Sequence, residues 1–112
     1  MPNDNYIIVL TTCNSAELAR SIGETLVSSK LAACVNIVKG VESVYQWQGT
    51  IKHDQEILLI IKTRQSLFPQ LKSAIQVLHD YELPEIIAVP IEAGEKNYLN
   101  WIQSATLATE IQ

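Results

Sequence analysis

The side chains best suited to hold a metal ion in this chain are a histidine and a cysteine. Imidazole nitrogen and thiolate sulfur are the donors that copper and zinc prefer, so His79 is the first candidate ligand and Cys13 the second, helped by a carboxylate such as Asp80. The ordinary alternatives are a solvated loop histidine and a buried structural thiol. A hydrolytic metal site would need more ligands than His79-Asp80 offers, because the only other histidine, His53, falls in a predicted hairpin.

A second group of polar and aromatic residues has no obvious structural purpose. Lys62 ends a wholly apolar run, where its ammonium must reach water, a carboxylate or a ligand, and Glu85 directly precedes a predicted buried strand. The two could form a structural salt bridge or grip a charged ligand, and the residue types alone favour the salt bridge. Tyr81 lies near Glu85 in sequence, and Tyr45 and Trp47 share one strand face, which is more often interface packing than a ligand site.

Motifs and composition argue against several classes of function. The sequence contains no glycine-rich phosphate loop, no Gly-x-Ser-x-Gly turn and no metalloprotease helix, so we expect a protein that is not an enzyme and has no organic cofactor. The net charge is −4, and the eight Lys and Arg residues are scattered rather than clustered. Without a basic stripe, nucleic acid is not an expected partner.

The length of the chain limits its fold class, and its N-terminal residues bear on its cellular location. The 112 residues, 47% of them apolar, predict a single domain over residues 1–112. No apolar run approaches the roughly 20 residues of a membrane span, and the N-terminal residues lack the features of a secretory signal. We therefore expect no membrane partner, a cytoplasmic location, and cysteines that remain thiols.

Apolar periodicity predicts a specific order of elements. Asn14 is expected to cap the first helix, with Glu17 reaching back to it. Gly40 is expected at a bulge within a long strand, and Pro69 in the first turn of the second helix. The predicted elements are strands at 6–10, 34–47, 51–63 and 86–91 and helices at about 15–28, 68–78 and 96–107, the last with Tyr98, Trp101, Ile102 and Ala105 on one side.

This order predicts an α+β fold. Strand, helix, strand, strand, helix and strand, followed by an appended helix, form a ferredoxin-like sandwich when the crossovers are right-handed. Both main helices then cover one face of a four-stranded antiparallel sheet. The polar candidates fall at strand ends and in loops of this arrangement.

The strands themselves predict self-association. The run from Glu56 to Thr63 holds five consecutive bulky apolar residues, which indicates a strand buried on both faces. If the helices cover one face, alternate residues such as Ile7 and Val9, or Leu58 and Ile60, must point away from them. Each large aliphatic residue left in water forgoes roughly 1.5–3 kcal/mol, so four forgo on the order of 10 kcal/mol, comparable with the stability of a small domain. We therefore expect a homo-oligomer.

Several separate motifs resemble the CutA family of divalent-cation tolerance proteins. The resemblance runs from about Tyr6 to Ile102, nearly the whole chain. It is carried by the segments Leu31 to Ile37, Ser43 to Gly49, Glu56 to Thr63, His79 to Ile91 and Tyr98 to Ile102.

The resemblance implies a homotrimer, similar in architecture to the PII signal-transduction proteins, with clefts between subunits. Carried over residue by residue, it places Tyr45, Trp47, Lys62, Tyr81 and Glu85 in such a cleft. The family is associated with copper. Two departures affect a copper site: Asp80 stands where the family loop commonly has proline, and two threonines precede Cys13.

The resulting hypothesis is a trimeric protein that binds copper or another divalent cation and takes part in the response to metal ions. One alternative is a PII-like signalling protein in which Lys62 and Glu85 hold a small charged molecule between subunits. Another is a structural or adaptor trimer whose partner binds the exposed rim.

Overall fold

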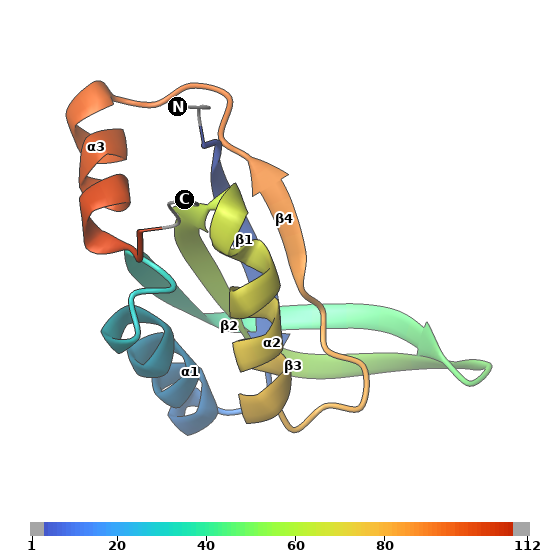
Figure 1. Ribbon diagram of the computed structural model, residues 1–112. Coiled ribbons are helices and arrows are strands. Elements are labelled where there is room, and N and C mark those ends of the chain that lie inside the picture. Colours follow the sequence, from blue (N-terminus) through green and yellow to red (C-terminus); the bar gives the residue numbers. More distant parts are fainter. Residues whose placement is uncertain (1–3, 109–112) are drawn as a thin grey trace.

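The computed structural model describes residues 4–108 (Figure 1). Four strands form one antiparallel sheet in the order β2-β3-β1-β4, with helices α1 and α2 between strands in sequence and α3 after the last. This confirms the ferredoxin-like α+β fold. The elements are β1 (Tyr6–Cys13), α1 (Ala16–Ser28), β2 (Cys34–Trp47), β3 (Thr50–Arg64), the 3-10 turn η1 (Gln65–Leu67), α2 (Phe68–Leu78), β4 (Ile87–Pro90) and α3 (Lys96–Ala105).

The core lies between the sheet and the pair α1 and α2. Ile22 and Leu26 of α1 and Leu71 and Ile75 of α2 are completely buried against it. The sheet contributes alternate residues of β1 and β3: Ile7, Val9, Leu59 and Ile61. The expectation that Ile7 and Val9 point away from the helices is therefore wrong, whereas Leu58 and Ile60 do lie on the other face, because neighbours along a strand alternate between faces.

That other face, called here the open face, is covered by α3 at one end only. Tyr6 and Arg64, paired across β1 and β3, contact α3: the Tyr6 hydroxyl bonds the Gln103 side chain at 3.1 Å, and Arg64 Nε donates to Thr106 Oγ1 at 2.9 Å. Ile102 of α3 is completely buried, while Tyr98 and Trp101 of the same predicted stripe are 43% and 44% exposed.

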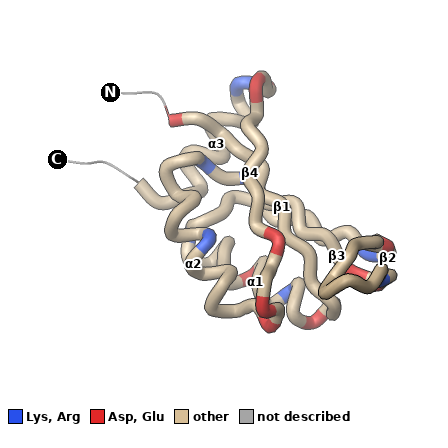
Figure 2. Tube along the Cα trace, turned by 90° about the vertical axis from the view of Figure 1, so that its right-hand side faces the viewer, with Lys and Arg blue, Asp and Glu red and all other residues tan. Residues whose placement is uncertain are grey.

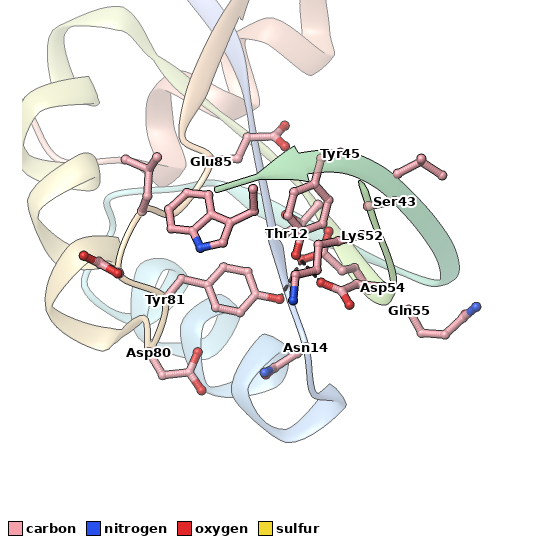
Figure 3. Close-up of a pocket in the computed structure, with 15 residues that line it drawn as sticks. Thr12, Asn14, Ser43, Tyr45, Lys52, Asp54, Gln55, Asp80, Tyr81 and Glu85 are labelled. Atoms are coloured by element: carbon pink, nitrogen blue, oxygen red, sulfur yellow. Dashed lines mark hydrogen bonds between the residues drawn. The ribbon is translucent and has the colours of Figure 1, made fainter. Parts of the chain in front are cut away.

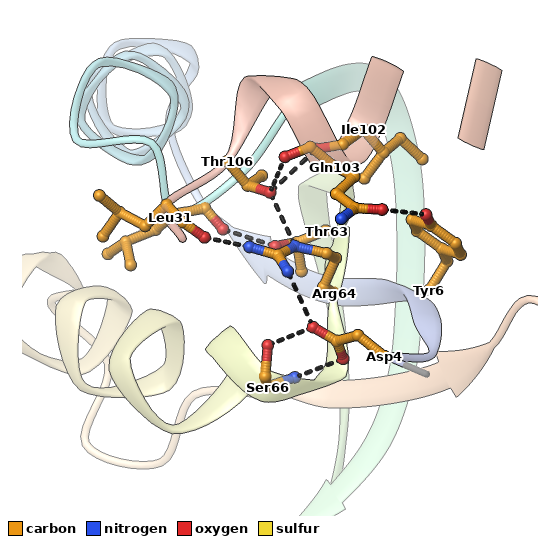
Figure 4. A network of polar contacts seen from close by, with 10 residues as sticks. Asp4, Tyr6, Leu31, Thr63, Arg64, Ser66, Ile102, Gln103 and Thr106 are labelled. Carbon is orange, nitrogen blue, oxygen red and sulfur yellow. Dashed lines mark hydrogen bonds and ion pairs between the residues drawn. The ribbon is translucent and has the colours of Figure 1, made fainter. Parts of the chain in front are cut away.

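Arg64 ties both ends of the described chain to the sheet (Figure 4). Its side chain is 6% exposed, and its guanidinium bonds three residues. Nη1 lies 3.0 Å from the Asp4 carboxylate, Nε bonds Thr106, and Nη2 donates to the Leu107 carbonyl. A buried guanidinium needs several acceptors to offset its lost hydration, so this network belongs to the fold.

Strands β2 and β3 run beyond the body as a two-stranded ribbon (Figure 1), which gives the molecule its long axis of 49 Å against 27 and 23 Å. The register shifts between Val38 and Val41, where Gly40 has a φ of 82°, as predicted for a bulge. The ribbon ends in a two-residue hairpin whose central residues, Gln48 and Gly49, both have positive φ, the conformation that suits the twist of the strands.

Helix α1 begins one residue later than the sequence predicts. Ser15 is the N-cap: its backbone is extended and its hydroxyl accepts the Leu18 N–H at 3.0 Å. Glu17 is then only the second helical residue and forms no capping box with Asn14. Asn14 is left to line a cleft on the open-face side.

Candidate binding cleft

An open cleft of about 890 Å³ lies where the ribbon leaves the body of the protein. Residues of the ribbon form one wall, and the loop between α2 and β4 forms the other. Thr12 near the end of β1 and Asn14 just after it also contribute to the lining. Figure 3 shows Tyr81 reaching from the loop toward Tyr45, Lys52 and Asp54 on the ribbon. The loop and the ribbon are brought together by the crossover of the fold, not by their sequence positions.

Four of the five residues that the sequence assigns to a cleft line this one. Tyr45 and Trp47 come from β2, and Tyr81 and Glu85 from the loop. Lys62 does not: it donates to the Asn36 side chain, and its Nζ lies 4.0 Å from the Cys34 sulfur. Lys62 is six residues beyond Glu56 along β3, so about 20 Å of extended strand separates the two. Among the ion pairs of residues 4–108 none joins Lys62 to Glu85, so the two do not form a salt bridge within one chain.

Two tyrosine–carboxylate pairs organise the cleft. The Tyr81 hydroxyl donates to Glu56 Oε2 at 2.6 Å, and the Tyr45 hydroxyl donates to Asp54 Oδ2. Burial, followed by the bond to Glu56, raises the pKa of Tyr81 well above its ordinary value. The bond to Asp54 is the main cause that raises the pKa of Tyr45. Both phenols therefore stay protonated at neutral pH and donate to carboxylates.

Asp54 and Glu56 are site residues that the sequence reasoning missed. They are two positions apart on β3 and so point to the same face, and Glu56 is only 9% exposed. The available signal was a carboxylate directly before the apolar run of β3. The partner of Glu56, Tyr81, is 25 residues away in sequence, and no local pattern reveals that contact.

His79 is buried beside the cleft with both ring nitrogens engaged. Nε2 lies 2.7 Å from the Thr12 carbonyl oxygen, and Nδ1 lies 3.1 Å from the Tyr81 backbone nitrogen. A carbonyl only accepts and an amide N–H only donates, so Nε2 carries the proton and Nδ1 supplies its lone pair to Tyr81. The ring also lies against Tyr81, with centroids 4.6 Å apart. In this arrangement His79 holds Tyr81 in place and has no free lone pair for a metal.

Cys13 is completely buried and belongs to the core. Its sulfur lies 3.5 Å from the Ser15 carbonyl oxygen, and burial raises the pKa of the thiol. A raised pKa disfavours the thiolate that metals bind. Within residues 4–108, no three His, Cys, Asp or Glu side chains are grouped closely enough to hold a metal ion.

The lining of the cleft is strongly acidic. One ammonium, that of Lys52, stands among five carboxylates: Asp54, Glu56, Asp80, Glu82 and Glu85. Elsewhere Lys and Arg are dispersed over the fold (Figure 2). A concave site with an excess of one charge concentrates ions of the opposite sign, so this cleft attracts cations. No helix within residues 4–108 is both long and apolar enough to cross a bilayer.

Comparison with known families matches residues 7–105 to "CutA1 divalent ion tolerance protein". The chain belongs to this family. It is 50% identical over 99 residues to the divalent-cation tolerance protein CutA of Thermus thermophilus, and the match covers 88% of this chain and 96% of that protein. It is 47% identical over 100 residues to the chloroplastic protein CutA of Arabidopsis thaliana, where the match covers 89% of this chain but 55% of the relative.

Solved CutA1 structures share the whole fold. The Thermus thermophilus protein superposes with a TM-score of 0.89 at 48% identity, covering 90% of this chain and 98% of its own. CutA1 from Oryza sativa superposes with a TM-score of 0.91 at 44% identity, covering 94% and 96%. The chain thus shares its fold with both CutA1 proteins over nearly its whole length.

Proposed function

We propose that this protein serves tolerance to divalent cations as a homotrimeric binding protein, without catalysis of its own, and that its cleft receives the cation. Membership of the CutA1 family and the name of the Thermus thermophilus relative support the cation. The observation that carries the proposal is the cleft lining, in which five carboxylates face one ammonium.

The open face supports self-association. Leu58 and Ile60 on β3 are half-buried, and Ile87 and Val89 on β4 are 50% and 44% exposed. Full burial of an exposed large aliphatic side chain contributes roughly 1.5–3 kcal/mol. Because these residues are already about half buried, covering them with a second copy recovers about half of that for each. A trimer rather than a dimer rests on the family resemblance.

Light scattering of the purified protein at micromolar concentration tests the assembly. The wild type should have three times the chain mass, and Leu58→Asp should lower it. Val77→Asp is the matched control, because Val77 lies on α2, away from the open face, and is 84% exposed. A wild-type protein of one chain mass would overturn the trimer.

Copper is the proposed cation, and two ligand sets compete for it. His79 with Cys13 supplies the softer donors that copper prefers, but His79 must first release Thr12 and Tyr81. The loop carboxylates Asp80, Glu82 and Glu85 are exposed and need no rearrangement. Asp54 and Glu56 are less exposed and already accept the Tyr45 and Tyr81 hydroxyls. Isothermal titration with Cu²⁺ and Mg²⁺ distinguishes the two ligand sets. Equal Cu²⁺ affinities of the wild type and His79→Ala would exclude His79 as a ligand. Equal affinities of the wild type and Asp54→Asn would exclude Asp54.

A small-molecule role, as in PII-like proteins, is the second candidate. The volume of about 890 Å³ falls within the range of sites that hold organic ligands, about 300–1,000 Å³, and far exceeds one metal ion. Because Lys62 lies outside the cleft of its own chain, a site using Lys62 and Glu85 together would need two protomers. Loss of ligand binding in both Lys62→Met and Glu85→Gln would support it.

We also propose a cytoplasmic location for this chain. Relatives differ in this respect, since the Arabidopsis thaliana protein is named chloroplastic and the CutA of Archaeoglobus fulgidus periplasmic. Cell fractionation with an antibody against the protein would decide the location.

A further inference from the structure

The buried carboxylate of Glu56 is the starting point. It is 9% exposed, and among residues 4–108 no ion pair joins it to Lys, Arg or His. Its bond to the neutral Tyr81 hydroxyl satisfies one oxygen but leaves the charge uncompensated. Glu56 is therefore a largely buried carboxylate whose charge a cation in the cleft would compensate.

Within one chain the cleft carboxylates do not converge on a single metal position. Calcium and magnesium need about six or more oxygen ligands at 2.0–2.6 Å, and the described residues provide no convergent set of even three acidic or soft donors. The Tyr45 and Tyr81 hydroxyls bond Asp54 and Glu56 separately. The carboxylates are thus distributed along the cleft rather than gathered at one point.

The aromatic side chains suit an organic cation instead. Tyr45 and Trp47 remain 40% and 37% exposed at the ribbon wall, and Tyr81 faces them from the loop. An ammonium within about 6 Å of an aromatic ring is attracted by the quadrupole of the ring, and its N–H groups can also donate to carboxylates. Metal ions gain little from such rings, whereas methylene groups between charged ends can pack against them.

We propose that the cleft binds a di- or polyamine, one ammonium at the ribbon carboxylates Asp54 and Glu56 and another at the loop carboxylates, with its alkyl chain along the aromatic side chains. The inference rests on the cation-binding role proposed above and names a ligand class for the same cleft. Two charged ends are required because the carboxylates stand on two opposing walls, the ribbon and the loop.

Isothermal titration of the full chain with 1,4-diaminobutane and spermidine, in metal-free and amine-free buffer, tests this. Both amines should bind, spermidine more tightly, and 1,4-butanediol, of the same length without charge, should not. Glu56→Gln, which keeps a partner for Tyr81, should weaken amine binding at least tenfold. Glu42→Gln is the matched control, because Glu42 lies on the opposite face of the ribbon beside His53 and should leave the affinity unchanged.

A buried substitution could disturb folding, so exposed Glu85→Gln provides a second variant and should also weaken the amines. Absence of binding by both amines, equal binding of the diol, or equal losses in Glu56→Gln and Glu42→Gln would overturn the inference. Titration with Cu²⁺ and Mg²⁺ distinguishes it from the metal proposal. Metal binding without amine binding refutes this inference alone, and amine binding without metal binding refutes the metal proposal alone.

Discussion

Replacing His79 with alanine separates a structural histidine from a metal ligand. The residue His79 is 9% exposed. Its ring bonds two backbone groups, the Thr12 carbonyl and the Tyr81 N–H. A buried polar group left without its partner costs about 1–3 kcal/mol. Removing the imidazole affects two such groups, so we expect His79→Ala to lower the free energy of unfolding by about 2–5 kcal/mol in the absence of any metal.

The assay is equilibrium unfolding in guanidinium chloride with EDTA present. Protomer concentration must be held fixed, because association stabilises the folded state by mass action. His53→Ala is the matched control: His53 is the other histidine of the chain, its side chain is 61% exposed, and its Nδ1 lies 3.5 Å from the Glu42 carboxylate. An exposed substitution of this kind should change stability by less than about 0.5 kcal/mol.

The opposite result would refute the assignment of His79 to the fold. If His79 were held ready for a metal, its removal would leave the metal-free protein nearly as stable as the His53→Ala control. Only the extra stability conferred by added Cu²⁺ would then be lost. A metal-free loss below about 0.5 kcal/mol would mean that the two backbone contacts do not contribute to stability as argued.

Three further changes should have measurable effects. Ser15→Ala removes the hydroxyl that caps α1 and should cost about 1 kcal/mol, whereas Asn14→Ala should cost less; equal losses would contradict the cap assignment. Arg64→Met leaves Asp4 without its ion pair and should cost about 3 kcal/mol, read as a lower unfolding midpoint. Because folding raises the pKa of Tyr81 above its ordinary 10.0, the unfolded chain ionises first, so stability present below pH 10 should fall as pH rises further. Tyr81→Phe should make that alkaline loss less steep, and an unchanged slope would contradict the role of Tyr81.

Periodicity and turn residues were sufficient to predict the topology. Each strand and helix was identified to within a few residues, and Gly40 occupies the bulge that its position suggested. These signals succeed because they are local: a positive φ, a break in an apolar run, or a repeat every three or four residues.

The errors arose where local signals were ambiguous. A strand that is apolar at every position does not reveal which alternate set faces the helices, and for β1 the set with Ile7 and Val9 was assigned to the wrong face. Asn14 and Ser15 are both good caps, and only the extended backbone at Ser15 decides between them. The donor type of His79 suggested a ligand, but whether a ring nitrogen is free to bind a metal depends on contacts such as that with the Thr12 carbonyl, 67 residues away.

The cleft and the open face are continuous, and this links assembly to binding. Thr12, which lines the cleft, pairs across the sheet with Leu58, and residues directly opposite in an antiparallel pair share a face. Glu56 lies on that face two positions before Leu58. A sister chain that covers Leu58 must therefore approach the rim of the cleft. It would lower the local dielectric around Glu56 and strengthen its attraction for a cation, so cation affinity and self-association should promote each other, as linkage requires.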